Sequence, residues 1–347
     1  MSDKRILIVD VNHIAFAQAF GGFTLTSKIN GQTVDTSIPN GVLKNVMRWS
    51  KNGKYPTVLC FDRACRPRKW YFDNFNQLSA TPEVKKYKAN REKMPSKMFT
   101  SIGLTENLLR QAGVTCLAAE GYEADDLIYA AIESAKKHYP GTPIDVVTGD
   151  SDLIPLVDDV VSVFLRSRKG TWAESKHIEK NKYIQVTPSN YRDVVKGLSS
   201  FKDYDIPYNL LLLLKITRGD ESDNVLGWKK KFPPRVVKEM LKRLEAAGFT
   251  GLSYGQKLPS KSDPLGSPEP IQNLIRVLRE TCSDLVDEDG LKHIYRTYIG
   301  INLNQAFIDY KNKQWVRKPI AVQKFEGFSP NALISAGKQI GINIRIS

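Results

Sequence analysis

Nine carboxylates that could bind metal stand in five short clusters along the chain. The clusters are Asp10, Asp62, Glu123 with Asp125 and Asp126, Asp150 with Asp152, and Asp220 with Asp223. Each pair of like charges in contact within a fold costs about 1 to 4 kcal/mol. Divalent cations are the simplest compensation, and ligand sets made only of oxygen favour Mg²⁺ or Mn²⁺ over zinc, which prefers Cys and His. The clusters therefore predict a divalent metal centre.

Four of these clusters directly follow apolar, strand-like runs, at residues 6–9, 58–61, 116–119 and 144–148. Parallel strands present their carboxyl ends at one sheet edge, where ligands bind. The alternation of strand-like and helical patterns predicts an α/β catalytic domain with a mostly parallel sheet over residues 1–198. A helix is expected to begin inside the third cluster, with Glu123 and Asp126 on one face and Asp125 diverging.

Beyond residue 198 the strand alternation stops, and helical patterns cover residues 208–217, 236–246 and 271–282. Residues 199–347 are therefore expected to form a second, mainly helical domain. Residues 342–346 alternate like a short strand, which would be the last strand of the domain or a docking segment for a partner. Asn30-Gly31, between β-prone residues, predicts a two-residue hairpin turn.

The chain is basic, with 51 Lys and Arg against 37 Asp and Glu and a net charge of +14. A basic surface around an acidic centre favours a polyanionic substrate, and nucleic acid is the obvious candidate. No apolar run approaches the roughly 20 residues of a membrane span. We therefore expect a cytoplasmic protein without a membrane partner, in the host cytoplasm if a phage encodes it.

The segment from residue 63 to residue 98, here termed the arch segment, interleaves cations with aromatic residues directly after Asp62. Cations with stacking platforms suit single-stranded nucleic acid. The alternative is a solvated basic helix whose aromatic side chains pack on the domain. The candidates for nucleic-acid binding here are Arg68, Lys69, Tyr87, Lys88 and Arg91.

Six motifs in order resemble the 5′-nuclease (flap endonuclease) family, especially its phage and bacterial branch with the phage replication ribonuclease H and 5′-3′ exonucleases. They lie at residues 8–10, 61–62, 87–91, 121–127, 148–152 and 219–224. The resemblance implies two Mg²⁺ or Mn²⁺ ions. The first would be held by Asp10, Asp62, Glu123, Asp125 and Asp150, and the second by Asp152, Asp220 and Asp223, with Asp126 as a further candidate. It also implies catalytic roles for Lys88, Arg91 and Asp150.

The family's glycine-rich helix-hairpin-helix turn, which grips duplex phosphates, would follow Asn224, but only Gly227 remains there. A basic patch of Lys229, Lys230, Lys231 and Arg235 is expected to replace it in the C-terminal DNA-binding domain. A solvated lysine loop is the alternative.

The resemblance implies a metal-dependent, structure-specific 5′-3′ exonuclease or flap endonuclease that removes RNA primers or 5′ flaps during DNA replication. Its substrate would be a DNA or RNA–DNA duplex with a 5′ flap or 5′ end. We expect a monomer that could meet single-strand binding protein or other replisome proteins. The alternatives are a non-catalytic DNA-binding replisome protein and a compact acidic-site ribonuclease.

Overall fold

The computed structural model describes residues 4–21, 24–63, 65–78, 86–90, 94–166, 183–196, 210–220, 223–227, 233–249, 251–252, 269–303, 307–309, 314–316, 320 and 322–345. In this part of the chain no helix has both the length and the apolar content that crossing a bilayer requires.

The centre of the molecule is a six-stranded sheet in the order β5-β4-β1-β6-β7-β8. Its strands are β1 (Ile6–Asp10), β4 (Thr57–Cys60), β5 (Thr115–Leu117), β6 (Ile144–Thr148), β7 (Val161–Arg166) and β8 (Tyr183–Val186). Neighbouring strands pair in parallel except β7 with β8, which are antiparallel. The predicted α/β fold with a mostly parallel sheet is confirmed.

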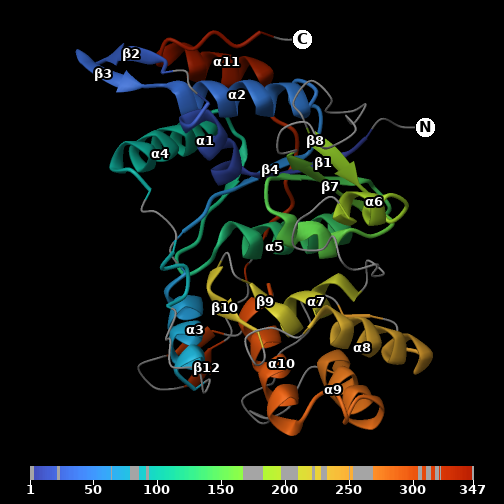
Figure 1. Ribbon diagram of the computed structural model, residues 1–347. Helices are drawn as coiled ribbons and strands as arrows, with labels where there is room; N and C mark the ends of the chain where they lie inside the picture. The colour runs from blue at the N-terminus through green and yellow to red at the C-terminus, as the bar shows by residue number, and fades with distance from the viewer. Residues whose placement is uncertain are drawn as a thin grey trace.

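Alternate side chains of the strands enter two separate cores, which is why these strands are apolar throughout. Leu7 and Val9 join a core with α1 (Val11–Ala19), α2 (Ser37–Trp49) and α4 (Ser96–Gln111). Ile6 and Ile8 face the other core, beneath α5 (Ala124–His138). Helix α5 thus lies between the sheet and the C-terminal helices (Figure 1).

The predicted hairpin turn is confirmed between β2 (Thr26–Ile29) and β3 (Gln32–Asp35). Asn30 and Gly31 both have positive φ, 48° and 80°, as a type I′ turn requires. The sheet also carries two short helices, the 3₁₀ helix η1 (Ser151–Leu156) after β6 and α6 (Tyr191–Lys196) after β8.

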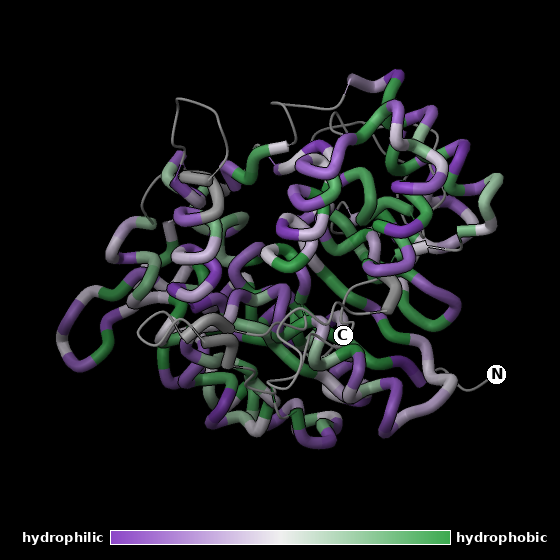
Figure 2. Tube along the Cα trace, turned by 90° about the horizontal axis from the view of Figure 1, so that it is seen from below, coloured by the Kyte–Doolittle hydropathy of each residue, from purple (hydrophilic) through white to green (hydrophobic). Residues whose placement is uncertain are grey.

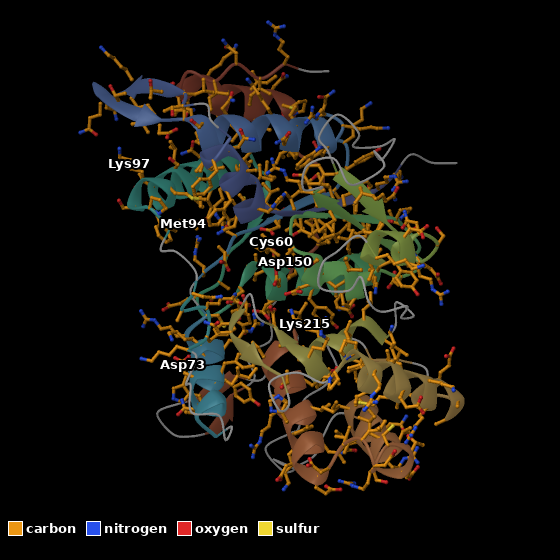
Figure 3. The ribbon with its side chains drawn as sticks, in the orientation of Figure 1. Cys60, Asp73, Met94, Lys97, Asp150 and Lys215 are labelled. Atoms are coloured by element: carbon orange, nitrogen blue, oxygen red, sulfur yellow. The ribbon has the colours of Figure 1, made fainter. Side chains whose placement is uncertain are left out.

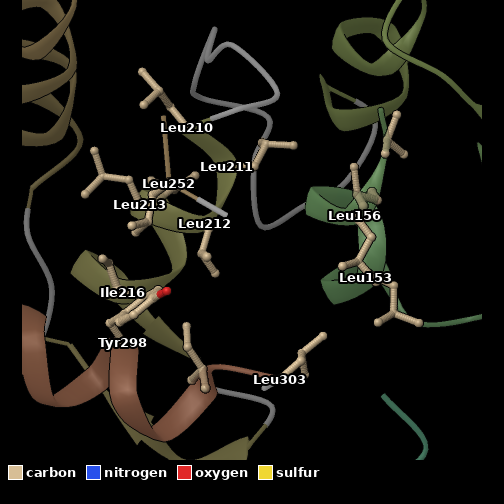
Figure 4. Close-up of a cluster of buried hydrophobic side chains, with 14 of the residues drawn as sticks. Leu153, Leu156, Leu210, Leu211, Leu212, Leu213, Ile216, Leu252, Tyr298 and Leu303 are labelled. Atoms are coloured by element: carbon tan, nitrogen blue, oxygen red, sulfur yellow. The ribbon is translucent and has the colours of Figure 1, made fainter. Parts of the chain in front are cut away.

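The C-terminal region is mainly helical, as predicted. Its elements are α7 (Leu211–Arg218), the hairpin of β9 (Gly219–Asp220) and β10 (Val225–Leu226), α8 (Pro234–Ala246), α9 (Glu269–Thr281), α10 (Glu288–Ile301), β11 (Phe307–Asp309) and β12 (Gln314–Val316). Ile216 of α7 lies beside Tyr298 of α10, and Leu153 and Leu156 of η1 lie across from the leucines of α7 (Figure 4). Hydrophobic stretches lie mainly inside the molecule and hydrophilic ones mainly at its edges (Figure 2).

The end of the chain returns to the sheet. Helix α11 (Pro330–Gln339) packs on α2 and α4, and the buried Ile342 and Ile344 extend the same core. The strand expected at residues 342–346 is wrong, because the described residues 342–345 pair with no strand. The two isoleucines alternate because they pack inward on helices. The division at residue 198 stays a prediction, and the α11 segment lies with the sheet rather than with the C-terminal helices.

Candidate active site

The carboxyl ends of β1 and β6 carry the first acids. Asp10 caps α1, where its Oδ1 accepts a hydrogen bond from the His13 backbone N–H at 3.2 Å, and its Oδ2 accepts one from Thr148 Oγ1 at 2.9 Å. Thr148 Oγ1 also accepts the Asp150 N–H at 3.0 Å. Thr148 therefore joins the ends of two adjacent strands, and it brings Asp10 and Asp150 to one edge of the sheet.

The third cluster forms the N-terminus of α5. Glu123 is the cap residue, and the Asp126 carboxylate accepts the Glu123 N–H at 3.0 Å. The Asp62 carboxylate accepts the next N–H, that of Ala124, at 3.1 Å. Anionic groups at a helix N-terminus are stabilised by unpaired N–H groups and the helix dipole. The helix thus begins inside the cluster, as predicted, and Asp62 is anchored beside Glu123.

The three acids of this cluster divide between two directions, as predicted. Glu123 and Asp126 both contact Arg68. Asp125 instead lies near Asp150 and Asp10, since burial and then the charges of these two acids raise the pKa of Asp125 well above its ordinary value. Asp125 therefore extends the acidic group at the sheet edge.

Arg68 of α3 (Arg66–Leu78) does not face solvent, so its expected role in binding nucleic acid is corrected. Only 5% of its side chain is exposed, and its guanidinium binds Glu123 and, at 2.6 Å, Asp126. These carboxylates hold the pKa of Arg68 above its ordinary value despite burial. Asp126 is fully buried beneath it. Arg68 is an internal counter-ion, and Asp126 is committed to this pair and to the helix cap.

Tyr87 is also corrected as a stacking platform for nucleic acid. Its ring is buried and stacks on Phe72 of α3, with centroids 5.0 Å apart and planes at 21°. Its hydroxyl donates to the carboxylates of Glu123 and Asp223, each at 3.3 Å. The alternative noted for the arch segment, aromatic residues packed on the domain, holds for these two rings.

Lys88, the predicted catalytic cation, lies among the acids. Its Nζ is 2.6 Å from Glu123 Oε1 and 3.4 Å from Asp223 Oδ2. The residue has a φ of 53°, a left-handed conformation that is uncommon outside glycine. Two hydrogen bonds hold this turn on the β9–β10 hairpin, from Lys88 N–H to Asp223 O and from Asn224 Nδ2 to Lys86 O, both at 2.9 Å.

Lys215 of α7 is a site residue that the sequence pattern did not indicate. Its Nζ contacts Asp152 and lies 3.3 Å from Asp220 Oδ2. Figure 3 shows Lys215 below Asp150, on the side of the C-terminal helices. The available signal was a single cation after the four leucines of residues 211–214, five positions before Asp220. Lys215 thus links the acids after β6 to the acid of β9.

The remaining predicted residues lie outside this group or outside the described residues. Lys69 is half exposed and pairs with Asp73 at 2.5 Å, four residues along α3. Arg235 is exposed at the start of α8. The predictions for Arg91, Lys229, Lys230 and Lys231 fall outside the part of the chain that the structure describes.

The site has the electrostatics of a carboxylate cluster in need of cations. Burial raises the pKa of Asp10 to about 7 and also raises that of Asp152. Glu123 behaves differently, because Arg68 and Lys88 overcome the effect of burial and hold its pKa at about 2. A cavity of about 30 Å³, enough for one or two waters, opens between Arg68, Glu123, Asp125, Asp152, Lys215, Asp220 and Asp223.

The donors fit Mg²⁺ or Mn²⁺ in kind, since all are carboxylate oxygens. Among the described residues, no group of three or more His, Cys, Asp or Glu side chains is already arranged to hold a metal ion. The cations Lys88, Arg68 and Lys215 instead engage Glu123, Asp152, Asp220 and Asp223.

Comparison with known proteins places the chain in a family. Residues 5–185 match the model of the 5′-3′ exonuclease N-terminal resolvase-like domain, and the chain belongs to this family. A 5′-3′ exonuclease of Bacillus subtilis is 28% identical over 232 residues, covering 66% of this chain and 67% of that protein. The DNA polymerase I of Mycobacterium leprae is 35% identical over 144 residues, covering 41% of this chain.

The chain spans only 13% of that polymerase, and 23% of the DNA polymerase I of Caldicellulosiruptor bescii, to which it is 24% identical over 230 residues. Among solved structures, the flap endonuclease of bacteriophage T5 is similar, with a TM-score of 0.52 and 14% identity over 97% of this chain and 93% of that one. The likeness confirms the fold, including the C-terminal region.

Proposed function

We propose that the protein is a metal-dependent, structure-specific nuclease that cuts DNA or RNA–DNA duplexes near a free 5′ end or 5′ flap. Primer or flap removal during DNA replication is the role this activity would serve. The observation that carries the proposal is the convergence of acids from β1, α5, the β9–β10 hairpin and the segment after β6, within a chain of the 5′-3′ exonuclease family. Lys88 and Lys215 contact the acids of α5, of η1 and of the hairpin. The related T5 flap endonuclease structure contains DNA and metal ions, which supports the same substrate class.

Eight of the predicted carboxylates would hold the metal ions. Asp10, Asp62, Glu123, Asp125 and Asp150 surround the sheet edge, and Asp152, Asp220 and Asp223 surround Lys215 and the hairpin. Two Mg²⁺ or Mn²⁺ ions bound there would activate the attacking water and stabilise the leaving 3′ oxygen. We leave Asp126 out of this set, because its carboxylate is buried against Arg68 and the α5 cap.

The chain's own cations would act on the phosphate. Lys88 Nζ, held by Glu123 and Asp223, lies where it can stabilise negative charge that develops on the scissile phosphate. The side chain is a quarter exposed, so a phosphate can reach it. Lys215 neutralises Asp152 and Asp220 and so keeps their mutual repulsion from opening the site.

The alternatives are less well supported. A non-catalytic DNA-binding protein gives no reason to bury several carboxylates whose pKa values are raised. A compact ribonuclease accounts for the sheet but not for Lys215, Asp220 and Asp223, which come from the C-terminal region.

The test compares labelled duplexes that carry a 5′ flap, a 3′ flap or no flap, with Mg²⁺ and with EDTA. We expect cleavage near the junction of the 5′ flap, poor cutting of the 3′ flap and no cutting in EDTA. A bulky protein bound at the 5′ terminus should slow cleavage if the strand must enter by its end. Equal cutting of both flaps would refute the polarity, and undiminished cutting in EDTA would refute the metal requirement.

A further inference from the structure

Helix α10 lies beneath the site without supplying an acid or a cation to it, yet it touches three of the elements that do. It packs on α3, on α7 and, through His293, on β10. Helix α3 carries Arg68, helix α7 carries Lys215, and Asp223 lies two residues before β10. One helix therefore supports side chains from all three elements. We propose that α10 positions the cation Lys88 and its partner Glu123 through a stack formed by Gly300, Phe72 and Tyr87. The inference rests on the proposed nuclease function.

The first contact of the stack is between Gly300 and the ring of Phe72. A Cβ atom built on Gly300 would lie 2.3 Å from Phe72 Cζ, with two further ring atoms within 2.9 Å. Ordinary van der Waals contact begins at about 3.4 Å. Helices α10 and α3 therefore lie about 1 Å closer together here than they could with any residue other than glycine at position 300. Phe72 is fully buried, which leaves its ring little freedom to move away.

The second contact of the stack, between Phe72 and Tyr87, makes the site depend on where the Phe72 ring lies. Phe72 stacks on Tyr87, whose hydroxyl donates to the carboxylates of both Glu123 and Asp223. Tyr87 directly precedes Lys88, whose Nζ binds the same two carboxylates. A shift of the Phe72 ring therefore moves the hydroxyl and the ammonium that hold Glu123.

Two hydrogen bonds fix α10 against the elements on either side of this stack. Tyr71 Oη donates to the carbonyl of Arg296, one turn before Gly300, at 2.8 Å. The imidazole Nε2 of His293 lies 2.9 Å from the carbonyl of Leu226, which is three residues beyond Asp223. Gly300, Phe72 and Tyr71 are positioning residues in this proposal, because none of them touches the acids directly.

The main experiment is Gly300→Ala, measured by single-turnover cleavage of a 5′-flap duplex at saturating protein with Mg²⁺. The rate should fall by about 100-fold, as expected for a displacement of about 1 Å at a catalytic group. The dissociation constant for the same duplex in EDTA should stay within twofold, because the three residues of the stack are buried and the change removes no basic side chain that a duplex could contact.

Gly103→Ala is the matched control. Gly103 also lies inside a helix, α4, but a Cβ built there meets no atom within 4 Å. Its rate should equal that of the unmodified protein. If Gly300→Ala does not fold, as judged by thermal unfolding, Tyr71→Phe takes its place. That change removes the hydrogen bond to α10 without altering shape, and it should slow cleavage by about threefold at unchanged duplex affinity.

Two outcomes would overturn the inference: an unchanged rate in Gly300→Ala, or a loss of rate that only follows a loss of duplex binding. An unchanged rate in Tyr71→Phe would overturn it where Gly300→Ala cannot be measured. Failure of the proposed function is a separate result, because the unmodified protein would then cut none of the duplexes.

Discussion

The two halves of the site are built by different means. Asp10, Asp125 and Asp150 stand at the ends of regular elements, where they end β1, open α5 and cap η1. Lys88 and Asp223 instead stand on turns, and Lys88 and Asn224 both have positive φ. The Asn224 side chain reaches Lys86, which is 138 positions away along the chain. The first half is therefore set by local rules, whereas the second depends on tertiary contacts.

The two halves also differ in charge balance. Glu123, Asp152, Asp220 and Asp223 each contact a lysine or an arginine. Among the residues that the structure describes, no such cation lies within salt-bridge distance of Asp10, Asp125 or Asp150. Burial, and after it the repulsion between neighbouring acids, raises the pKa values of Asp10 and Asp125, and bound cations are left to relieve this repulsion. We therefore expect the largest effects from changes in the sheet-edge half.

The largest effect is expected from Asp150→Asn. Removing this charge should lower single-turnover cleavage by about 1,000-fold, the upper range for loss of one electrostatic group in an active site. Affinity for the duplex in EDTA should change by less than twofold, because the sheet edge carries acids rather than phosphate-binding cations. A near-normal rate would remove the sheet-edge half from the chemistry.

The matched control is Asp145→Asn on β6, the strand that Asp150 follows. Asp145 is more buried than Asp150, but it lies toward the other end of the strand and pairs with Arg5 at 2.9 Å. The same chemical change there should leave the cleavage rate within twofold of normal. A similar loss in both variants would mean that the strand, rather than the acid, is responsible.

A smaller effect is expected in the tertiary half, from Lys88→Ala. Loss of the ammonium should lower single-turnover cleavage by about 100-fold, with duplex affinity nearly unchanged. Lys69→Ala is the control in the same arch segment, because its pair with Asp73 is exposed and contributes little. If both variants cleave equally fast, Lys88 serves only to balance Glu123.

The same contrast explains how far the sequence could predict the site. The different direction of Asp125 from Glu123 and Asp126 could be predicted from the helical period, because all three residues belong to the start of one helix. Lys215 escaped detection because its partner Asp152 lies 63 positions away. Arg68 and Tyr87 were placed correctly near the acids but with the wrong orientation, since a basic and aromatic composition suits an exposed clamp and a buried ion-paired stack equally well.

The buried acid Asp145 tests how much of a raised pKa comes from burial in the sheet alone. Its pKa is raised from 3.8 to about 6 by burial, and Arg5 opposes the shift. The folded state thus holds a proton between pH 4 and 6 that the unfolded state releases, so stability from this group is present below pH 4 and is lost as pH rises through 6. From pH 4 to 7 the loss should be about 2 kcal/mol.

Denaturant unfolding of the unmodified protein and Asp145→Asn at pH 4.5, 6 and 7.5 measures this difference. The variant should gain stability relative to the unmodified protein as pH rises, because its amide cannot ionise. A difference that does not depend on pH would show that Arg5 already compensates the carboxylate fully. The raised pKa values at the sheet edge would then owe more to clustering than to burial.

The smallest effect is expected for the basic patch after the β9–β10 hairpin, where Lys229, Lys230 and Lys231 would be changed together to Gln. Duplex contacts made by lysine release counterions, so each lost phosphate contact should flatten the dependence of binding on salt by about one unit of slope. Affinity at moderate salt should fall by about tenfold. The single-turnover rate at saturating protein should stay within twofold, because the patch follows the hairpin and leaves Asp220 and Asp223 in place.

The control for this prediction removes the same number of charges elsewhere: Lys238, Lys242 and Lys292, on exposed faces of α8 and α10, are changed together to Gln. Equal slopes in the two triple variants would mean that the tertiary half of the site grips the duplex by general charge rather than through this patch.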